Sequence, residues 1–567
     1  MKISFKFNPG RLSIYFLYVL SVIAFIAVSW FSFFYIFHDL GYLKNWFLSL
    51  NPCIYNATGW QSWFNPVTKE NGNLYCIAAI IASITGLIYI LWKWSKLNKI
   101  REYYLYSVTI APRHVLFPGL LILLQIFLWL WGQTMVAPAF DEVFSAVNCA
   151  AVPVFQCMAY YMLPNNHIFF NVLNNILFHN AGDQVLTGRL ISLFAWLVLV
   201  KWAYYWFAGQ FKNRLFAFLA SIVLAVQFST WGFAFQARGY ELYALEQWAS
   251  FILLFDYIST GHKKYLVLNS IFCIMGYITI PTFLYFHVAK VLFMIIYQAV
   301  HKKIDTVFWK YQVLTFLFVF FFYLPALCFS GAGAFLHNKY VSPSAASGAE
   351  FFHKAMYFFR TYIEYCFSNS SLSYSFLSLI LFLLPILLLF SRKARWIGIF
   401  FITLVATFVA MVFLMKTYPF HRSLVGQYAI ILTIAIITLY HLVERIFSKY
   451  LRAVFPAIMV LLAAYFLWIG PRGMAFNLYF DDARPSQTAI SQKLDSLPKG
   501  TVLGCSDQSF YWYYLCRQKN IAAHQCPDGR ETYYVKQQDE PFPVGINNLL
   551  YILQAKIKDY ELYRVRP

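Results

Sequence analysis

Long apolar runs recur along most of the chain, and they constrain its fold more than any other feature of the sequence. A helix needs roughly 20 mostly apolar residues to cross the hydrocarbon core of a bilayer. Runs of this kind occupy residues 12–37, 74–94, 115–134, 189–208, 214–232, 241–259, 264–280, 282–300, 309–330, 373–391, 396–415, 423–443 and 453–470. The sequence therefore predicts an all-α, multi-pass membrane protein with about 13 transmembrane helices.

The composition excludes a water-facing surface over most of the molecule. Hydrophobic residues make up 60% of the chain and charged residues only 12%, whereas soluble proteins are about a quarter charged. A formal net charge of +21 would point to a nucleic acid partner in a soluble protein. Here the lysines and arginines stand in short clusters between apolar runs, which indicates membrane topology and no nucleic acid.

The basic clusters fall in alternate loops, so they can all face the cytoplasm. The residues in these clusters are Lys96, Lys99, Arg101, Arg113, Lys212, Arg214, Lys263, Lys264, Lys302, Lys303, Arg392, Lys393, Arg395, Arg445, Lys449 and Arg452. Pro281 interrupts the stretch 264–300, which is either a hairpin of two short spans or one kinked helix. Only the hairpin keeps every cluster on one side. We therefore expect a cytoplasmic N-terminus and an extracytoplasmic C-terminal segment.

Two domains are expected from this layout. Residues 1–470 form the transmembrane module, in which the outer loop 135–188 is the most unusual segment, and residues 471–567 form a small soluble domain. The pattern of the soluble domain predicts an α/β fold. Its expected elements are a buried strand at 501–505, a helix or strand at 508–517 and a helix over 546–560.

Cysteines are the next feature of the outer segments. Cys53 and Cys76 lie near the two ends of one outer loop, and Cys505, Cys516 and Cys526 lie in the C-terminal segment. Disulfides can form there if these segments face an oxidising compartment, and unpaired thiols fit the sequence equally well. None of the cysteines has the spacing of a metal site.

The outer loop 135–188 contains two adjacent acids, Asp141 and Glu142. One interpretation is a helix N-terminus, with Asp141 as the N-cap and Glu142 in the first turn. The other is a general base at the boundary between water and lipid. The two interpretations are compatible, because a residue at a helix start can also face an active site.

Further along the same loop, Asn166 and His167 precede a run in which asparagines recur at helical spacing. The asparagines of this run are Asn171, Asn174 and Asn175. A narrow polar stripe among apolar residues predicts a helix lying in the membrane interface, with His167 at its start. His167 is either structural or a residue that holds an anionic group.

Two outer arginines, Arg238 and Arg422, run against the bias that places positive charge inside. Arg238 could form a salt bridge with Glu241 or Glu246, or both arginines could bind a phosphate, for which the guanidinium fork is well shaped.

Glu246 and Lys290 fall within predicted spans, where an ionisable residue is a candidate functional residue or pairs with a neighbour. Tyr240 and Lys416, close to the two arginines in sequence, are candidates for substrate binding. No phosphate-binding glycine loop, nucleophile elbow or zinc motif is present, so the sequence gives no support for nucleotide-driven chemistry on the inner side.

The order of these motifs resembles the GT-C superfamily of membrane glycosyltransferases, in particular the branch of the protein mannosyltransferases and the lipid A aminoarabinose transferases. Asp141-Glu142 resembles the Asp-Glu motif of the first large outer loop. Asn166-His167-Ile168-Phe169 stands where that branch has His-Pro-Pro-Leu or Lys-Pro-Pro-Leu, but both prolines are missing. The segments 237–240 and 419–424 resemble its Arg-x-Tyr and Pro-x-x-Arg-Tyr-Leu elements, the latter with serine in place of tyrosine.

The resemblance implies an inverting glycosyltransferase that moves a sugar from a polyprenyl-phosphate donor to an acceptor hydroxyl on the outer face of a bacterial plasma membrane. The acceptor would be a lipid, a glycan or a protein. Asp141 would be the base and Glu142 its support, and His167, Arg238 and Arg422 would bind the donor phosphate. The candidates for other substrate contacts are Asn166, Tyr240, Glu246 and Lys416. A divalent metal is not expected in this branch, and the soluble domain would cover the site.

Two other classes fit parts of the sequence. A transporter or flippase of lipid-linked glycans would also need outer arginines, but it predicts internal repeats, which the sequence does not show. A polymerase or ligase of the O-antigen type would use Arg and His in a large late loop, and the loop 331–372 offers His337, His353 and Arg360.

Overall fold

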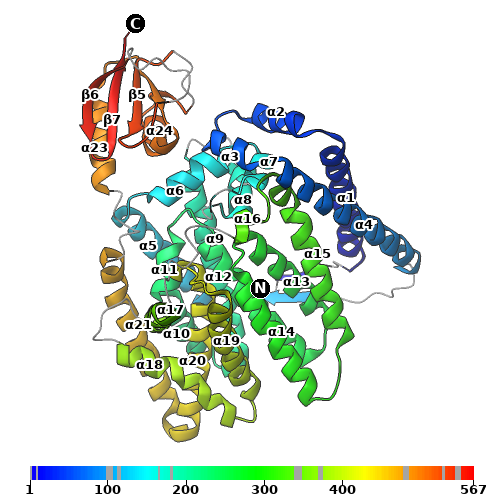
Figure 1. Ribbon diagram of the computed structural model, residues 1–567. Coiled ribbons are helices and arrows are strands. Elements are labelled where there is room, and N and C mark those ends of the chain that lie inside the picture. Colours follow the sequence, from blue (N-terminus) through cyan, green and yellow to red (C-terminus); the bar gives the residue numbers. More distant parts are fainter. Residues whose placement is uncertain are drawn as a thin grey trace.

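The computed structural model describes residues 3–7, 10–97, 106–110, 116–161, 163, 166–178, 183–336, 348–367, 375–476, 484–525, 530–542 and 551–566. The residues outside these ranges that the sequence singles out are Lys99, Arg101, Arg113, His337 and Cys526. A large helical body is joined to a small domain with a β-sheet at the C-terminus (Figure 1). We call the end of the helical body next to this domain the outer end, and the opposite end the inner end.

In the described residues, every predicted span is mainly helical. The helices are α1 (Gly10–Phe37), α4 (Pro66–Leu97), α5 (Leu116–Met135), α9 (Gln184–Phe211), α10 (Arg214–Ala225), α11 (Phe228–Ala234), α12 (Tyr240–Thr260), α13 (Lys263–Thr279), α14 (Phe283–Val300), α15 (Thr306–Phe329), α18 (Ser375–Leu383) with the 3₁₀ helix η4 (Leu384–Phe390), α19 (Arg395–Met415), α20 (Val425–Ile446) and α21 (Leu451–Phe476). Among the described residues, 8 helices are long and apolar enough to cross a membrane, or 9 if α10 and α11, bent by 66°, form one broken span. The multi-pass helical class is confirmed, whereas the number 13 and the orientation stay predictions.

Short elements connect these helices. They are β1 (Ile3–Phe7), β2 (Tyr106–Ile110), α2 (Leu40–Leu50), α3 (Ala57–Trp63), α6 (Phe140–Ser145), the π-helix η2 (Ala146–Ala150), α7 (Val154–Ala159), α8 (Ile168–Phe178), α16 (Gly333–Leu336), α17 (Gly348–Phe367), and the 3₁₀ turns η5 (His421–Leu424) and η6 (Ser448–Tyr450). Strands β1 and β2 pair antiparallel. The outer loop 135–188 thus folds into a set of short helices and is not an open loop.

The stretch around Pro281 forms two helices. Helix α13 ends at Thr279 and α14 begins at Phe283, so the chain breaks where proline would remove a helical hydrogen bond. The stretch is therefore divided into two helices at Pro281, and their crossing of the membrane as a hairpin of two spans stays a prediction.

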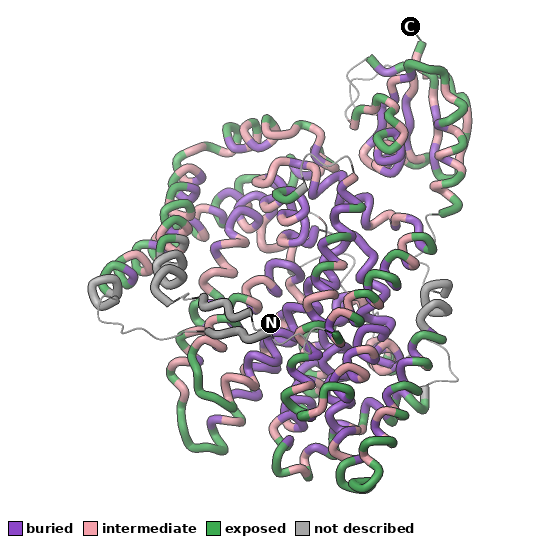
Figure 2. Tube along the Cα trace, turned by 180° about the vertical axis from the view of Figure 1, so that it is seen from behind, coloured by how far each residue is buried: buried purple, intermediate pink, exposed green. Residues whose placement is uncertain are grey.

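Helix α20 lies at the centre of the body. In its most apolar window 89% of the residues are buried, against 22% for α4 and 22% for α21. Trp248 on α12 donates from Nε1 to Thr433 Oγ1 on α20 over 3.0 Å. Buried residues gather in the middle of the helical body (Figure 2). Because lipid tails are as apolar as these side chains, close packing and such hydrogen bonds stabilise the bundle more than hydrophobic burial does.

The C-terminal domain has the predicted α/β composition. Its elements are α23 (Arg484–Asp495), β3 (Val502–Cys505), η7 (Asp507–Ser509), α24 (Phe510–Gln518), β4 (Ala522–His524), β5 (Tyr533–Gln537), β6 (Tyr551–Ile557) and β7 (Tyr560–Val565). The strand order is β4-β3-β5-β7-β6. Strand β3 is parallel to both neighbours, and β7 is antiparallel to both of its own. The expected domain boundary at residue 470 lies within α21, which continues to Phe476.

The helix predicted over residues 546–560 is wrong for residues 551–560, and residues 546–550 lie outside the described ranges. Residues 551–557 form strand β6, which pairs with β7 from Tyr551↔Val565 to Ile557↔Tyr560. Lys558 takes a left-handed conformation (φ 56°) in the tight turn between them. A few apolar residues can match helical spacing by chance, and here the hydrogen bonds to β7 determine the conformation.

The cysteines separate into two groups. Cys53 is disulfide-bonded. Cys76, Cys505 and Cys516 are buried free thiols, so a Cys53–Cys76 bridge and a Cys505–Cys516 bridge are both excluded. A disulfide in the loop that contains Cys53 agrees with an oxidising compartment on the outer side.

The C-terminal domain packs directly on the segment that contains the acidic pair. Tyr511 of α24 donates its hydroxyl to the Pro138 carbonyl over 2.9 Å, and its ring lies 4.7 Å from that of Phe140. Asp507 accepts from the Asn56 amide at 2.9 Å. The domain therefore contacts both α6 and the loop that contains Cys53.

Candidate active site

Helix α6 presents the two acids in its first turn. The N-cap is Ala139, so Asp141 is the second helical residue and Glu142 the third. The expectation that Asp141 is the N-cap is therefore wrong. Glu142 Oε2 accepts from the Ala139 amide at 2.8 Å, which is one half of a capping box and places the N-cap two residues before Asp141. Both carboxylates lie near the positive end of the helix dipole.

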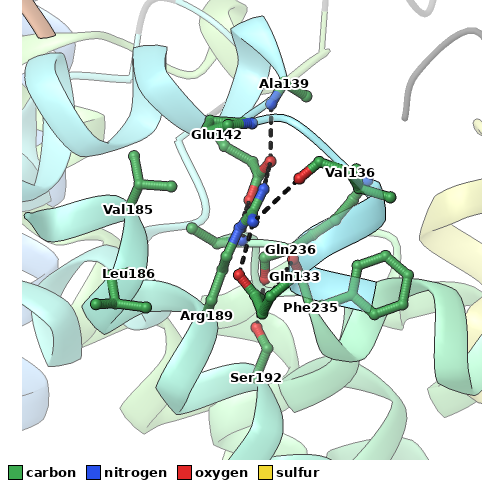
Figure 3. Close-up of polar contacts among 12 residues, drawn as sticks. Gln133, Val136, Ala139, Glu142, Val185, Leu186, Arg189, Ser192, Phe235 and Gln236 are labelled. Atoms are coloured by element: carbon green, nitrogen blue, oxygen red, sulfur yellow. Dashed lines mark hydrogen bonds and ion pairs between the residues drawn. The ribbon is translucent and has the colours of Figure 1, made fainter. Parts of the chain in front are cut away.

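Glu142 is buried and fully engaged (Figure 3). Arg189 of α9 binds it with two bonds of 2.9 Å, from Nε to Oε1 and from Nη2 to Oε2. The Ala237 amide donates to Oε1 at 2.6 Å and the Ala139 amide to Oε2. The carboxylate thus joins α6, α9 and the segment before α12.

Arg189 was not among the predicted site residues. It is fixed in turn by Gln133 of α5, whose Oε1 accepts from Nη1 at 2.7 Å. The sequence does hold a signal for it, since an arginine at the outer end of a predicted span breaks the inside-positive bias just as Arg238 and Arg422 do.

Asp141 differs from its neighbour because its side chain remains 32% exposed and lines a cavity. Its Oδ2 lies 3.1 Å from Arg422 Nη1, which comes from η5 at the start of α20. The ion pair thus joins residues 281 positions apart in sequence (422 − 141). It leaves a carboxylate that is fixed in place and still open to a substrate.

Arg238 is buried beneath Asp141. Its Nη1 donates to the Asp141 carbonyl at 3.0 Å and to Ser145 Oγ at 2.5 Å. Its guanidinium carbon lies 5.5 Å from the centre of the Tyr240 ring, a cation–π distance. The salt bridge considered with Glu241 or Glu246 is not formed. In the described part of the chain, both Glu241 oxygens lack a hydrogen-bond partner, and Glu246 accepts only from Thr279, at 3.0 Å.

His167 stands just before α8, as predicted, and faces Arg238. Its Nδ1 accepts from the Gly239 amide at 2.9 Å, so in the neutral ring the proton is on Nε2, 3.4 Å from Arg238 Nη2. Burial lowers the pKa of His167 well below its usual value, and Arg238 and Arg422 lower it further. The ring is therefore neutral near pH 7, and two N–H groups face each other where an anionic oxygen could accept from both.

Tyr240 and Arg422 complete the polar surface. The guanidinium carbon of Arg422 lies 5.9 Å from the centre of the Tyr240 ring and 4.9 Å from that of Phe420. The adjacent His421 is hydrogen-bonded to Thr361 and Tyr428 at 2.9 and 3.0 Å. The Tyr240 ring thus packs against both Arg238 and Arg422, and the Phe420 ring against Arg422. These ring contacts leave the positive charge of each guanidinium in place.

These side chains enclose a cavity of about 210 Å³. Its walls come from α6, α11, α12, α17 and the start of α20, and consist of Ala139, Phe140, Asp141, Glu142, Phe228, Ser229, Phe233, Gln236, Arg238, Tyr240, Tyr365, Phe420, His421, Arg422 and Tyr428. Two guanidinium groups suit an anion, the aromatic walls suit an apolar or sugar surface, and the accessible carboxylate can accept a proton.

Three predicted site residues lie elsewhere. Asn166 is buried next to His167, but its amide donates to the Cys157 and Tyr160 carbonyls at 2.8 and 2.9 Å. Glu246 lies inside the bundle against Thr279. Lys416 is exposed and ends α19 in a left-handed conformation (φ 49°). None of the three lines the cavity, and His167 is not in its lining either, although its ring lies 3.4 Å from Arg238, which is.

The polar stripe of α8 has a different role from the one expected. Its asparagines are buried, and they satisfy backbone groups of the neighbouring turns instead of facing water. Asn175 donates to the Ala150 and Val152 carbonyls at 2.6 Å each, and Asn174 donates to the Gln184 carbonyl at 2.8 Å. These bonds hold the end of η2 and the start of α9 against α8, and Asn171 donates to Asn166 Oδ1, beside His167, at 2.9 Å.

The two described residues expected of a polymerase or ligase, His353 and Arg360, do not line the cavity. His353 is exposed on α17, and Arg360 pairs with Glu364 one turn along the same helix at 3.1 Å. His337 lies outside the described residues. Within the described ranges no group of three His, Cys, Asp or Glu side chains could hold a metal ion.

Comparison with known proteins shows which solved structures share the fold of this chain. No family profile and no curated protein matches the sequence. The chain is similar to the crystal structure of ArnT from Cupriavidus metallidurans bound to undecaprenyl phosphate, with a TM-score of 0.51 and 13% identity, over 78% of this chain and 97% of that one. The chain therefore has the fold of ArnT. The apo form of ArnT gives a TM-score of 0.47 at the same identity. The likeness to ArnT confirms the expected resemblance in fold. The chemistry has to be argued from the residues of this chain.

Proposed function

We propose that this protein is an inverting glycosyltransferase that moves a sugar from a polyprenyl-phosphate donor to an acceptor hydroxyl on the outer face of a bacterial plasma membrane. One observation supports this most directly: the accessible Asp141 carboxylate pairs with Arg422 beside the buried Arg238, in a cavity at the outer end of a GT-C fold.

The donor phosphate would bind between the cavity arginines. Arg422 Nη groups and Arg238 Nη2 supply positive charge, and the Nε2–H of the neutral His167 adds a hydrogen bond without adding charge. Negative charge grows on the phosphate as the bond to the sugar breaks, so donors fixed beforehand stabilise the transition state more than the ground state. The solved structure of ArnT with undecaprenyl phosphate supports a lipid phosphate as the ligand of this fold.

Asp141 is the proposed base. The acceptor oxygen attacks the anomeric carbon, its proton passes to Asp141 Oδ, and the carbon–oxygen bond to the phosphate breaks on the opposite face of the sugar with its electron pair on the phosphate. This single displacement inverts the anomeric configuration. Arg422 stabilises the negative charge of the carboxylate before the reaction, and Arg238 fixes the backbone beneath it through the Asp141 carbonyl.

Glu142 is proposed as a positioning residue. Its bonds to Arg189, Ala139 and Ala237 fix α6 against α9 and against the segment that holds Arg238. No step in the proposal uses a metal. The C-terminal domain, which packs on α6, would limit access to the cavity and contact the acceptor.

The test is an assay of purified protein with polyprenyl-phosphate sugars, comparing wild type with Asp141→Asn. Removing the base should lower kcat by about 10²–10⁴-fold while donor binding persists. Undiminished activity in the variant would exclude Asp141 as the base. Movement of lipid-linked sugar without a new glycosidic bond would instead favour a flippase.

A further inference from the structure

A second hollow, of about 440 Å³, lies at the inner end of the bundle. It is formed where η4 and the turn that follows it meet the last turns of α20, at the end of the body remote from the C-terminal domain (Figure 1). Because α20 has 22 residues, its two ends are about 30 Å apart, so this hollow is separate from the candidate active site.

Its polar wall is strongly cationic. Arg392, Lys393 and Arg445 line it, and all three are exposed. Within the described ranges none of the three forms an ion pair with a carboxylate, and the one acid in the wall, Glu444, lies 3.4 Å from His441. Three cations against one acid leave an excess of positive charge that an anion could neutralise.

Its other wall is apolar and faces outward. Leu387 and Phe390 are 45% and 76% exposed, and Leu442 lies opposite them on α20. Leu387 and Phe390 belong to η4, a 3₁₀ segment of 7 residues that begins with Leu384-Pro385. Such long 3₁₀ runs are uncommon. Proline lacks the N–H of a regular turn, so the chain leaves α-geometry just where the hollow opens.

Cationic and apolar walls that meet at a membrane surface select an amphiphile. A basic cluster alone needs no ligand, because positive charge at the inner end is the ordinary topology signal. A basic hollow between helices, next to exposed apolar side chains, matches a phosphate head group with acyl chains, and basic pockets on this side of membrane proteins bind anionic lipid heads.

We propose that this inner hollow is a binding site for an anionic phospholipid. The phosphate is held by Arg392, Lys393 and Arg445, and the acyl chains lie along Leu387, Phe390 and Leu442. The lipid joins the η4 segment to α20 and so stabilises the inner end of the bundle. This site is independent of the proposed glycosyl transfer.

The test measures thermal unfolding of the detergent-purified protein with phosphatidylglycerol, phosphatidylcholine of the same acyl chains, or inorganic phosphate. Phosphatidylglycerol should raise Tm by about 3 °C over phosphatidylcholine, because a ligand that binds only the folded state stabilises it. The triple variant R392A/K393A/R445A should lose this difference. The matched control K263A/K303A/K310A, which removes three exposed lysines outside the hollow, should keep it.

Equal shifts in the triple variant and in wild type would overturn the site, and an equal shift with inorganic phosphate would overturn the lipid as its ligand. If the triple variant does not fold, native mass spectrometry of the wild type decides. The proposal expects one retained phosphatidylglycerol in preference to phosphatidylcholine, and Arg445→Gln should reduce that retention. No preference in the wild type would also refute it.

Discussion

Helix α20 has a cationic hollow at each end, and the two differ in what surrounds their arginines. At the outer end Arg422 pairs with Asp141 in a cavity of about 210 Å³ with aromatic walls. At the inner end Arg445 joins Arg392 and Lys393 in a wider hollow of about 440 Å³ beside exposed leucine and phenylalanine side chains. Positive charge is common to both, so it cannot by itself mark a catalytic site. An accessible carboxylate fixed against the cation is what distinguishes the outer end.

The largest expected difference in activity is between two variants that each remove an arginine, one at the outer end of α20 and one at the inner end. Arg422→Ala should lower kcat/KM by about 10²–10³-fold, because it removes a fixed donor from the developing phosphate charge. Arg445→Ala should change it by less than about twofold, since inner-end charge does not contact the reacting groups. Initial rates with a polyprenyl-phosphate sugar measure both. Similar losses in the two variants would contradict the separation of roles.

The second comparison is between the adjacent acids Asp141 and Glu142, and it concerns the free energy of unfolding instead of the reaction rate. Glu142→Gln leaves Arg189 buried without its counter-charge, which should destabilise the fold by about 3–5 kcal/mol. Asp141→Asn, at a partly exposed position, should change the free energy of unfolding by less than about 1 kcal/mol. Thermal unfolding of the two variants in the same detergent measures this. Equal stability would show that the Glu142–Arg189 pair is not structural.

A smaller effect is expected where the C-terminal domain meets α6. Tyr511→Phe removes the hydrogen bond to the Pro138 carbonyl, a net loss of about 1 kcal/mol, and should lower kcat about threefold to tenfold with little change in KM. Tyr513→Phe, on the same helix and half-buried, serves as the matched control. An unchanged kcat for Tyr511→Phe would show that the domain does not position Asp141.

The last effect is a pH dependence of stability from His167, which concerns the folded state and not the rate. Its pKa is depressed by burial and by the nearby arginines, so below about pH 6.5 the unfolded chain binds a proton that the folded protein does not. Stability from this residue is therefore constant above about pH 6.5 and declines as the pH falls below it. His167→Gln should flatten the decline in Tm between about pH 6.5 and 5. The same slope in the variant would assign the decline to other groups.

Much of the site could be predicted because its signals are local. Acids in an outer loop and arginines on the wrong side of the membrane stand out from the sequence, and Asp141, His167, Arg238, Tyr240 and Arg422 do converge in the structure. The different environments of Asp141 and Glu142 could not be predicted. They depend on Arg189, which approaches from another helix 47 residues away.

By itself, the sequence determined the helical multi-pass class, the break at Pro281 and the α/β character of the C-terminal domain. Each follows from hydropathy or from a residue's own backbone chemistry, which act over one helix or strand. Tertiary structure alone decided that residues 551–557 form a strand and that the asparagines of α8 face inward. It also decided which acid stays accessible. Those outcomes depend on partners far away in sequence, because a buried polar group lies where another segment satisfies its hydrogen bonds.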